Sequence, residues 1–181
     1  MSSISNSVIT RRRLLLGLAG WPLLALADGS PAQPVLPAAG LIRWGSGEFR
    51  RFGFLVYEAT LWAGADDPAR PPLALKLTYK RNISGRDIAE ASVKEIRNLE
   101  LVDEARLKSW GEQMSRIFPD VRPGDQITGL HLPEAARFFH NERSIGDIGD
   151  PAFAQAFFAI WLDPRTSAPE LRAALLKRPA A

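Results

Sequence analysis

Four side chains of this sequence are suited to binding a small polar or anionic group: Arg43, Tyr57, Tyr79 and Arg81. An arginine guanidinium presents a planar fork of donors that matches a carboxylate, and a tyrosine hydroxyl adds a neutral donor. The run Tyr79-Lys80-Arg81-Asn82 falls where a predicted strand ends and a predicted helix begins. The N–H groups of a helix N-terminus favour anions. The same run also fits a solvated strand end, so both interpretations stay open.

More arginines surround a predicted turn at residues 45–47. Arg43 precedes this turn, and the pair Arg50-Arg51 follows it. Arg43 is the candidate for a forked contact with a carboxylate. For Arg50 and Arg51 the sequence favours a solvated edge, where charge discourages pairing with another chain.

No catalytic residue, metal site or cofactor is predicted. The sequence has no cysteine and two histidines, His131 and His140, which are too few ligands for most metal sites. We expect both histidines to be ordinary strand residues. No G-x-S-x-G motif is present. Trp44-Gly45-Ser46-Gly47 lacks the spacing of a dinucleotide-binding or phosphate-binding loop, and this segment is predicted as a turn.

Residues 1–27 have the three parts of a cleavable bacterial signal peptide. A polar start leads to Arg11-Arg12-Arg13, an apolar run follows, and Ala25-Leu26-Ala27 supplies small residues for cleavage before Asp28. Thr10-Arg11-Arg12-Arg13-Leu14-Leu15 resembles a twin-arginine signal, although the general secretion route stays open. The apolar run is shorter than the about 20 residues that a spanning helix needs. We therefore expect a periplasmic protein with no stable membrane anchor after cleavage.

The remainder of the sequence is predicted to be one domain with balanced charge. Residues 28–40 are rich in proline, alanine and glycine and are predicted as a disordered leader, and residues 41–181 as the domain. The whole chain has 23 Lys+Arg against 20 Asp+Glu. Three of these arginines lie in residues 1–27, which contain no other charged residue, so the mature part is neutral. A neutral domain does not favour a nucleic-acid partner.

The hydrophobic pattern predicts strands, two helices, more strands and two more helices. The cleanest alternation is in residues 73–79, and residues 52–62 read as a strand covered on both sides. Predicted helices begin at Ser84, Asp103, Asp150 and Ser167, each a side chain that can cap a helix. Further strands are predicted at residues 126–132, 137–141 and 144–145. Segregated runs of this kind imply an α+β domain, with helices on one face of a mainly antiparallel sheet.

Four segments together resemble the bacterial chalcone isomerase-like proteins. They are GEFRRFGFLVYEATLW at 47–62, LKLTYKRNI at 75–83, GDQI at 124–127 and FAQAFFAIWL at 153–162. The resemblance spans about residues 41–177. It implies an open-faced β-sandwich, in which a large antiparallel sheet carries a layer of helices. The family contains both true isomerases and non-catalytic fatty-acid-binding proteins.

The resemblance also implies where catalytic residues would lie. In the plant enzymes an arginine, a threonine, a tyrosine and an asparagine bind and orient the flavonoid. The best placement puts Phe52 or Gly53 at the threonine, Ile88 at the tyrosine and Glu95 at the asparagine, and none matches. Arg43 is the nearest candidate for the arginine. Without these polar groups the charge that develops during cyclisation is not stabilised.

The sequence therefore favours a non-catalytic binding or carrier protein over an enzyme. The expected ligand is small and apolar or amphipathic, with an anionic ligand such as a fatty acid as one form of it, and is bound by Arg43, Tyr57, Tyr79 and Arg81. Two alternatives stay open. One is an isomerase or lyase acting on another substrate, and the other is a scaffold or assembly partner in the cell envelope.

Overall fold

The computed structural model describes residues 40–178 of the chain, so the predicted signal peptide at 1–27 and nearly all of the predicted leader at 28–40 lie outside the described residues. The described residues form six strands and four helices. In chain order these are β1 (Ile42–Arg51), β2 (Phe54–Ala63), β3 (Leu73–Tyr79), α1 (Gly85–Asn98), α2 (Glu104–Ile117), β4 (Gln126–His131), β5 (Ala136–His140), β6 (Arg143–Ile148), α3 (Pro151–Leu162) and α4 (Pro169–Leu175).

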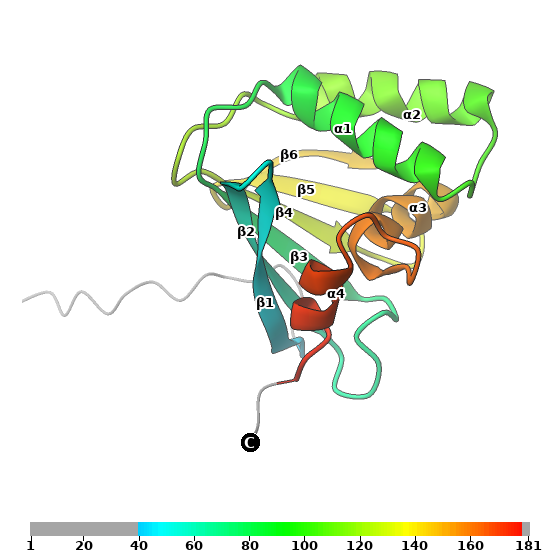
Figure 1. Cartoon of the computed structure of the whole chain (residues 1–181). Coiled ribbons are helices and arrows are strands. Elements are labelled where there is room, and N and C mark those ends of the chain that lie inside the picture. The colour runs from blue at the N-terminus through cyan, green and yellow to red at the C-terminus, as the bar shows by residue number, and fades with distance from the viewer. Residues whose placement is uncertain (1–39, 179–181) are drawn as a thin grey trace, which may run out of the picture. The chain divides into compact units, whose positions relative to one another are not determined.

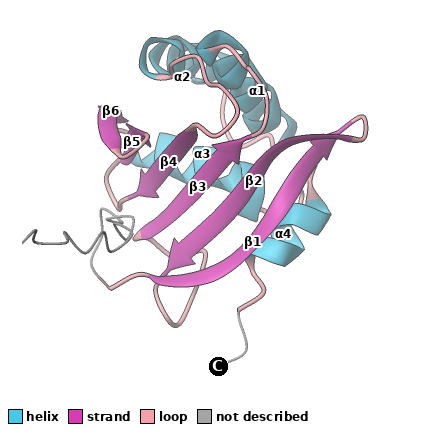
Figure 2. Cartoon of the chain, turned by 90° about the vertical axis from the view of Figure 1, so that its left-hand side faces the viewer, coloured by secondary structure: helices cyan, strands magenta, loops and turns pink. Residues whose placement is uncertain are grey.

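The six strands form one sheet in the order β1-β2-β3-β4-β5-β6, and each strand is antiparallel to its neighbours. The helices gather on one side of the sheet (Figure 1). Figure 2 looks onto the opposite side, with the helices behind the strands. The predicted α+β architecture, an open-faced sandwich with a helical layer on one face, is confirmed.

Alternation along β3 shows how the sequence builds this layer. Leu73, Leu75, Leu77 and Tyr79 are buried and belong to the main core between sheet and helices, whereas Lys76 lies on the opposite face. Successive strand residues point to opposite faces, so one period-two run supplies a whole inner surface. Helix α3 is buried along nearly its full length against this surface.

Three predicted helix starts are confirmed, at Ser84, Asp103 and Asp150, because each side chain accepts a hydrogen bond from a backbone N–H in the first turn. Asp150 also accepts hydrogen bonds from Trp110 Nε1 at 2.9 Å and Arg106 Nη2 at 2.9 Å. Burial opposes ionisation of Asp150, but these hydrogen bonds outweigh it and lower the pKa of the carboxyl. One carboxylate therefore caps α3 and ties it to α2.

The predicted turn at residues 45–47 is wrong, because β1 continues through it to Arg51, with an irregularity in its pairing to β2 between Arg43 and Ser46. The chain instead reverses at Phe52-Gly53, where both residues have positive φ. Gly45 has a different role: a Cβ there would meet the backbone carbonyls of Ala174 and Leu175. The glycine lets α4 approach the strand closely, which a sequence pattern does not distinguish from a turn.

The last predicted helix start is also wrong in detail. Helix α4 begins at Pro169 with Ala168 as its N-cap, and no side chain caps it. The hydroxyl of Thr166 accepts a hydrogen bond from the Ala168 N–H at 3.2 Å, while Ser167 is exposed. Within residues 40–178, no helix has both the length and the apolar character needed to cross a bilayer.

Candidate ligand-binding site

Two neighbouring cavities lie between the inner face of the sheet and helices α1 and α3. The larger has a volume of about 200 Å³ and the smaller about 100 Å³. They share Arg51, Ala91, Ser92 and Trp161 in their walls. Arg51 is exposed at the end of β1, so it marks the side on which both cavities open to solvent.

The larger cavity has an apolar wall and a few polar groups. Tyr79 reaches it from the end of β3 and is only 3% exposed. No hydrogen bond joins the Tyr79 hydroxyl to another described residue. Asp87 is held by the Ser84 hydroxyl at 2.7 Å within the first turn of α1. The apolar wall consists of aliphatic and aromatic side chains: Leu77, Ile83, Ile88, Phe118, Ile127 and Phe157.

The smaller cavity is built around Tyr57 on β2. The Tyr57 hydroxyl accepts a hydrogen bond from Trp161 Nε1 at 3.0 Å, which leaves its own proton for another acceptor. Phe49 of β1 stacks on the Tyr57 ring with centroids 4.9 Å apart. The Tyr79 ring meets Tyr57 edge-on at 5.9 Å. Glu95 of α1 completes the polar lining.

Both tyrosines are held in the neutral form. Burial raises the pKa of Tyr57 above its ordinary value; the hydrogen bond from Trp161 opposes this, and the charge of Glu95 adds to it. Burial also raises the pKa of Tyr79, with a further contribution from Tyr57. At neutral pH the cavities therefore present two hydroxyl donors and no phenolate.

The structure brings together two of the four predicted ligand-binding residues. Tyr57 and Tyr79 line the cavities. Arg43 is exposed near the other end of β1, and its guanidinium donates to the Ser46 hydroxyl at 2.9 Å. Arg81 is exposed outside the cavities, with its guanidinium 4.5 Å from the centroid of the Phe54 ring.

The arginine that does line the cavities, Arg51, was predicted as part of a solvated edge. Its charge is exposed, but it lies on the same side of β1 as Phe49, which faces the Tyr57 ring. The signal available in the sequence was this phase, since residues two apart on a strand share a face. The sequence pattern places the turn at residues 45–47 and begins the next strand at Phe52, so it misses the real hairpin turn next to Arg51.

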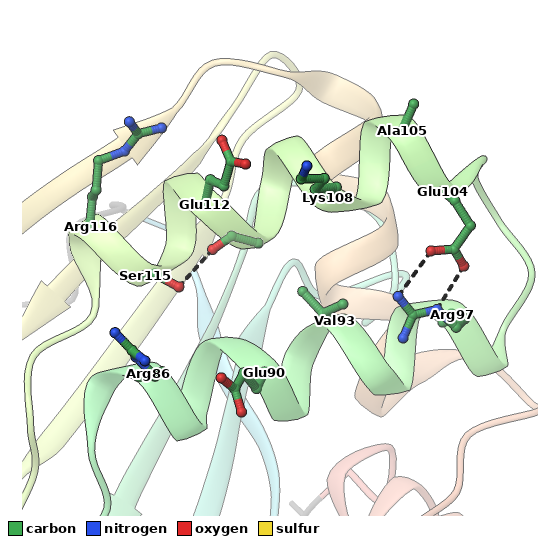
Figure 3. A pocket seen from close by; sticks show the side chains of 11 residues that line it. Arg86, Glu90, Val93, Arg97, Glu104, Ala105, Lys108, Glu112, Ser115 and Arg116 are labelled. Atoms are coloured by element: carbon green, nitrogen blue, oxygen red, sulfur yellow. Dashed lines mark hydrogen bonds and ion pairs between the residues drawn. The ribbon is translucent and has the colours of Figure 1, made fainter.

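A wider groove of about 990 Å³ lies elsewhere, on the outer side of α1 and α2 (Figure 3). Side chains of both charges line it, and the Arg97–Glu104 ion pair spans the two helices at one end, at 2.6 Å. Val93 and Gly111 lie where the helices touch. A wide groove of mixed charge does not enclose a small ligand, so the cavities under α1 are the better candidate.

The histidines stand apart from both cavities. His131 is 8% exposed on β4, and its ring stacks on Phe158 with centroids 4.9 Å apart. Burial lowers its pKa to about 4, and its Nδ1 has no hydrogen-bond partner among the described residues. His140 lies 3.7 Å from a carboxylate oxygen of Asp125. Among residues 40–178 no three acidic, histidine or cysteine side chains cluster as metal ligands would.

Comparison with known proteins shows the family to which the chain belongs. A sequence profile described as chalcone isomerase-like matches residues 45–177, which cover nearly the whole described domain. The chain belongs to the chalcone isomerase-like family. An uncharacterised protein of Haemophilus influenzae is 33% identical over 144 residues, covering 77% of this chain and 71% of that protein.

A solved structure supports the fold of this chalcone isomerase-like protein. The fatty-acid binding protein of Arabidopsis thaliana superposes with a TM-score of 0.58, covering 77% of this chain and 88% of its own, at 12% identity. At that identity the likeness shows the fold alone. Of the positions placed at the plant catalytic residues, Ile88 and Glu95 line the two cavities, whereas Phe52 and Gly53 form the exposed hairpin turn.

Proposed function

We propose that this protein is a periplasmic binding or carrier protein for a small, mainly apolar carboxylic acid held in the cavities under α1. One observation carries the proposal. The Tyr79 side chain is buried in the wall of the larger cavity, its hydroxyl has no hydrogen-bond partner among the described residues, and the exposed Arg51 lines the same cavity. The hydroxyl is not fully enclosed, so it is available to donate to a ligand in the cavity.

Each part of the larger cavity has a distinct role in this proposal. The ligand carboxylate pairs with Arg51 and accepts a hydrogen bond from Tyr79. The ligand chain lies against the apolar wall that includes Ile88, Phe118 and Phe157. Each cavity also has one carboxylate in its wall, Glu95 in the smaller and Asp87 in the larger, where the Ser84 hydroxyl donates to it. The ligand head is expected beside Arg51 and Tyr79, the two donors in the wall of the larger cavity.

The volumes restrict the size of the ligand. Binding sites for small molecules usually enclose about 300–1,000 Å³, and the two cavities together only reach the lower end of that range. A medium-length chain fits better than a long one. The Arabidopsis relative of the same fold is named a fatty-acid binding protein, which agrees with this ligand class.

Calorimetric titration with lauric acid and with dodecanol tests the proposal. Lauric acid should bind, and dodecanol, the same chain without the charge, should bind more weakly. Arg51→Gln should weaken lauric acid binding about two- to fivefold, since an ion pair with an exposed arginine is worth about 0.5–1 kcal/mol. Dodecanol binding should change little in this variant.

Arg50→Gln is the matched control. Arg50 is the neighbouring arginine, but its guanidinium binds Glu48 at 2.8 Å on the exposed side and does not line these two cavities. Lauric acid affinity should be unchanged in this variant. If neither ligand binds to the wild-type protein, the proposed function is wrong. If the two arginine variants behave alike, the assignment of the carboxylate to Arg51 is wrong.

A second candidate function is isomerisation of an unknown substrate, and one observation favours it. Two neutral tyrosine hydroxyls converge on adjacent cavities, and hydroxyl donors of this kind can stabilise an oxyanion. Incubating the protein with chalcones and other enones, followed by chromatography, tests it. Product that disappears in Tyr79→Phe would favour the enzyme; turnover that is unchanged in this variant would remove the tyrosines from the reaction.

A further inference from the structure

The turn between β1 and β2 combines features that ordinary hairpins avoid. It has two central residues, Phe52 with φ of 51° and Gly53 with φ of 80°, between the paired Arg51 and Phe54. Two positive φ angles characterise the type I′ turn, whose first central position strongly prefers asparagine, aspartate or glycine. A bulky residue in this region is a true outlier. Such strain is a reason to look for a function.

The two phenylalanines of this turn point into solvent. Phe52 is 87% exposed and Phe54 is 59% exposed, which makes them the most exposed large hydrophobic side chains among the described residues. Neither is needed to fill the core. The strained backbone at Phe52 destabilises the isolated protein, and no packing of its exposed side chain offsets this. We therefore look for a binding partner that the side chain contacts.

Positive charge surrounds the aromatic tip. Arg51 lies 5.4 Å from the centroid of the Phe52 ring, and Arg81 lies 4.5 Å from that of Phe54. Neither arginine forms an ion pair with a described residue. The neighbouring cations are different, since Arg50 pairs with Glu48 and Lys80 pairs with Glu58.

We propose that this tip, defined as residues 51–54 with Arg81, docks reversibly on an anionic phospholipid surface. Aromatic side chains flanked by arginine suit the boundary between headgroups and acyl chains, where the rings enter the apolar region and the guanidinium groups meet phosphates. A protein partner fits less well. Stable protein interfaces bury about 800 Å² on each side, whereas this tip is a single narrow turn.

The tip also adjoins the candidate ligand site. Arg51 belongs to the tip and lines both cavities. Docking would therefore bring the opening of the cavities to the lipid surface, where an amphipathic acid is most concentrated. The docking itself does not rest on the proposed ligand, and it is tested without one.

Sedimentation of the full chain with vesicles measures the docking. Vesicles that contain phosphatidylglycerol should bind the protein, and vesicles of phosphatidylcholine alone should bind it less. Phe52→Asn should weaken binding about tenfold, because a buried phenylalanine side chain contributes roughly that factor or more. Arg81→Gln should weaken binding several-fold to the anionic vesicles only. Arg70→Gln, at an exposed arginine in the β2–β3 loop, is the charge-matched control and should change nothing.

Phe52→Asn has a second use, because it places asparagine before Gly53 and so matches the preference of the turn. Its free energy of unfolding should be equal to or higher than that of the wild type. If the variant is less stable, Phe52 has a structural role and the proposal is wrong. If the variant is stable and binds anionic vesicles like the wild type, the proposal is also wrong.

A site-specific probe separates the tip from any other segment that attaches the full chain to vesicles. The chain has no cysteine, so Phe52→Cys accepts a single environment-sensitive fluorophore. Ala69→Cys is the control, since Ala69 is exposed in the loop at the other end of β2. Anionic vesicles should shift the emission of the Phe52→Cys label alone. Equal responses at both positions, or none, would overturn the proposal.

Analytical ultracentrifugation tests the competing occupant, a second copy of the chain. If the wild type forms a dimer that Phe52→Asn dissociates, and vesicles do not bind, the tip is a protein interface and the membrane proposal is wrong. Lauric acid titration of Phe52→Asn keeps the two proposals separate, since Phe52 does not line the two cavities. Loss of vesicle binding with unchanged acid binding is the expected pair of results.

Discussion

Replacing Tyr57 by phenylalanine should destabilise the protein, whereas the same replacement at Tyr79 should not. The two residues are alike in type and in raised pKa, and their rings touch, although Tyr79 is buried and Tyr57 only partly buried. They differ in their hydroxyl partners. The Tyr57 hydroxyl accepts the N–H of Trp161 at 3.0 Å, and the Tyr79 hydroxyl has no partner among the described residues.

The difference in cost follows from which group each replacement leaves behind. Tyr57→Phe strands the indole N–H of Trp161, a side chain that is 7% exposed, and an unsatisfied buried donor costs about 1–3 kcal/mol. Tyr79→Phe removes a hydroxyl that has no partner among the described residues and is not fully enclosed, so no buried group loses its partner. Its free energy of unfolding should change by less than about 0.5 kcal/mol.

Urea unfolding followed by circular dichroism measures both variants against the wild type, and equal m-values would show that the comparison is valid. Titration with lauric acid then measures the effect of Tyr79→Phe on ligand affinity. Tyr79→Phe should weaken the affinity about two- to tenfold, the worth of one neutral hydrogen bond. A Tyr79→Phe variant that loses as much stability as Tyr57→Phe would refute the reasoning, because its hydroxyl would then have a structural partner.

Three further predictions concern the framework around the site. Gly45→Ala should cost about 1–3 kcal/mol, since its Cβ meets the backbone of α4, while Gly64→Ala, which meets nothing within 4 Å, should cost less than about 0.5 kcal/mol; equal losses in urea unfolding would contradict this. His131 has a folded pKa of about 4, below its unfolded value of 6.5, so the stability that it contributes is complete above pH 6.5 and is lost as the pH falls towards 4. Relative to His131→Phe, the wild type should lose about 1–2 kcal/mol between pH 7 and pH 4.5, and parallel pH profiles would contradict the assignment. Asp150→Ala should cost about 2–3 kcal/mol, because it removes the cap of α3 and the acceptor of Trp110, and a loss below about 0.5 kcal/mol in thermal unfolding would show that neither contact matters.

Local chemistry is why so much of the fold could be predicted. Ser84, Asp103 and Asp150 each cap a helix by accepting a hydrogen bond from a backbone N–H two or three residues later. Such a cap can be predicted from neighbouring residues alone. The alternation in β3 likewise fixes which of its residues face the core. The order of these elements then restricts the architecture to a sheet with one helical layer.

The predicted turn at residues 45–47 is wrong because the role of Gly45 depends on a segment that is distant in the sequence. Glycine is used both where φ is positive and where another backbone approaches closely. At Gly45 the partner is α4, which lies more than a hundred residues later in the sequence. Nothing local separates the two uses. The true turn at Phe52-Gly53 was obscured because its first residue is one that such turns avoid.

The candidate site shows the same division. Tyr57 and Tyr79 could be named from the sequence, because each is a polar aromatic residue on a strand with a predicted buried face. The choice among arginines could not be made in this way. Arg43, Arg51 and Arg81 are the same residue type, and the sequence pattern does not distinguish them. Arg51 lines the cavities because the hairpin turn follows it directly. An error of a few residues in one turn therefore changes the predicted cation of the site.

The end of the β1–β2 hairpin connects the two proposals made for this protein, and this limits which variants can separate them. Arg51 lies against Phe52 on one side and lines the cavities on the other. Replacing Arg51 should weaken both acid binding and vesicle binding, so an Arg51 variant cannot separate the two proposals. Phe52 and Tyr79 each belong to one function alone. If Phe52→Asn slows the transfer of lauric acid from anionic vesicles without changing its affinity in solution, then docking controls how the ligand reaches the cavity; if both stay the same, the tip and the cavity work independently.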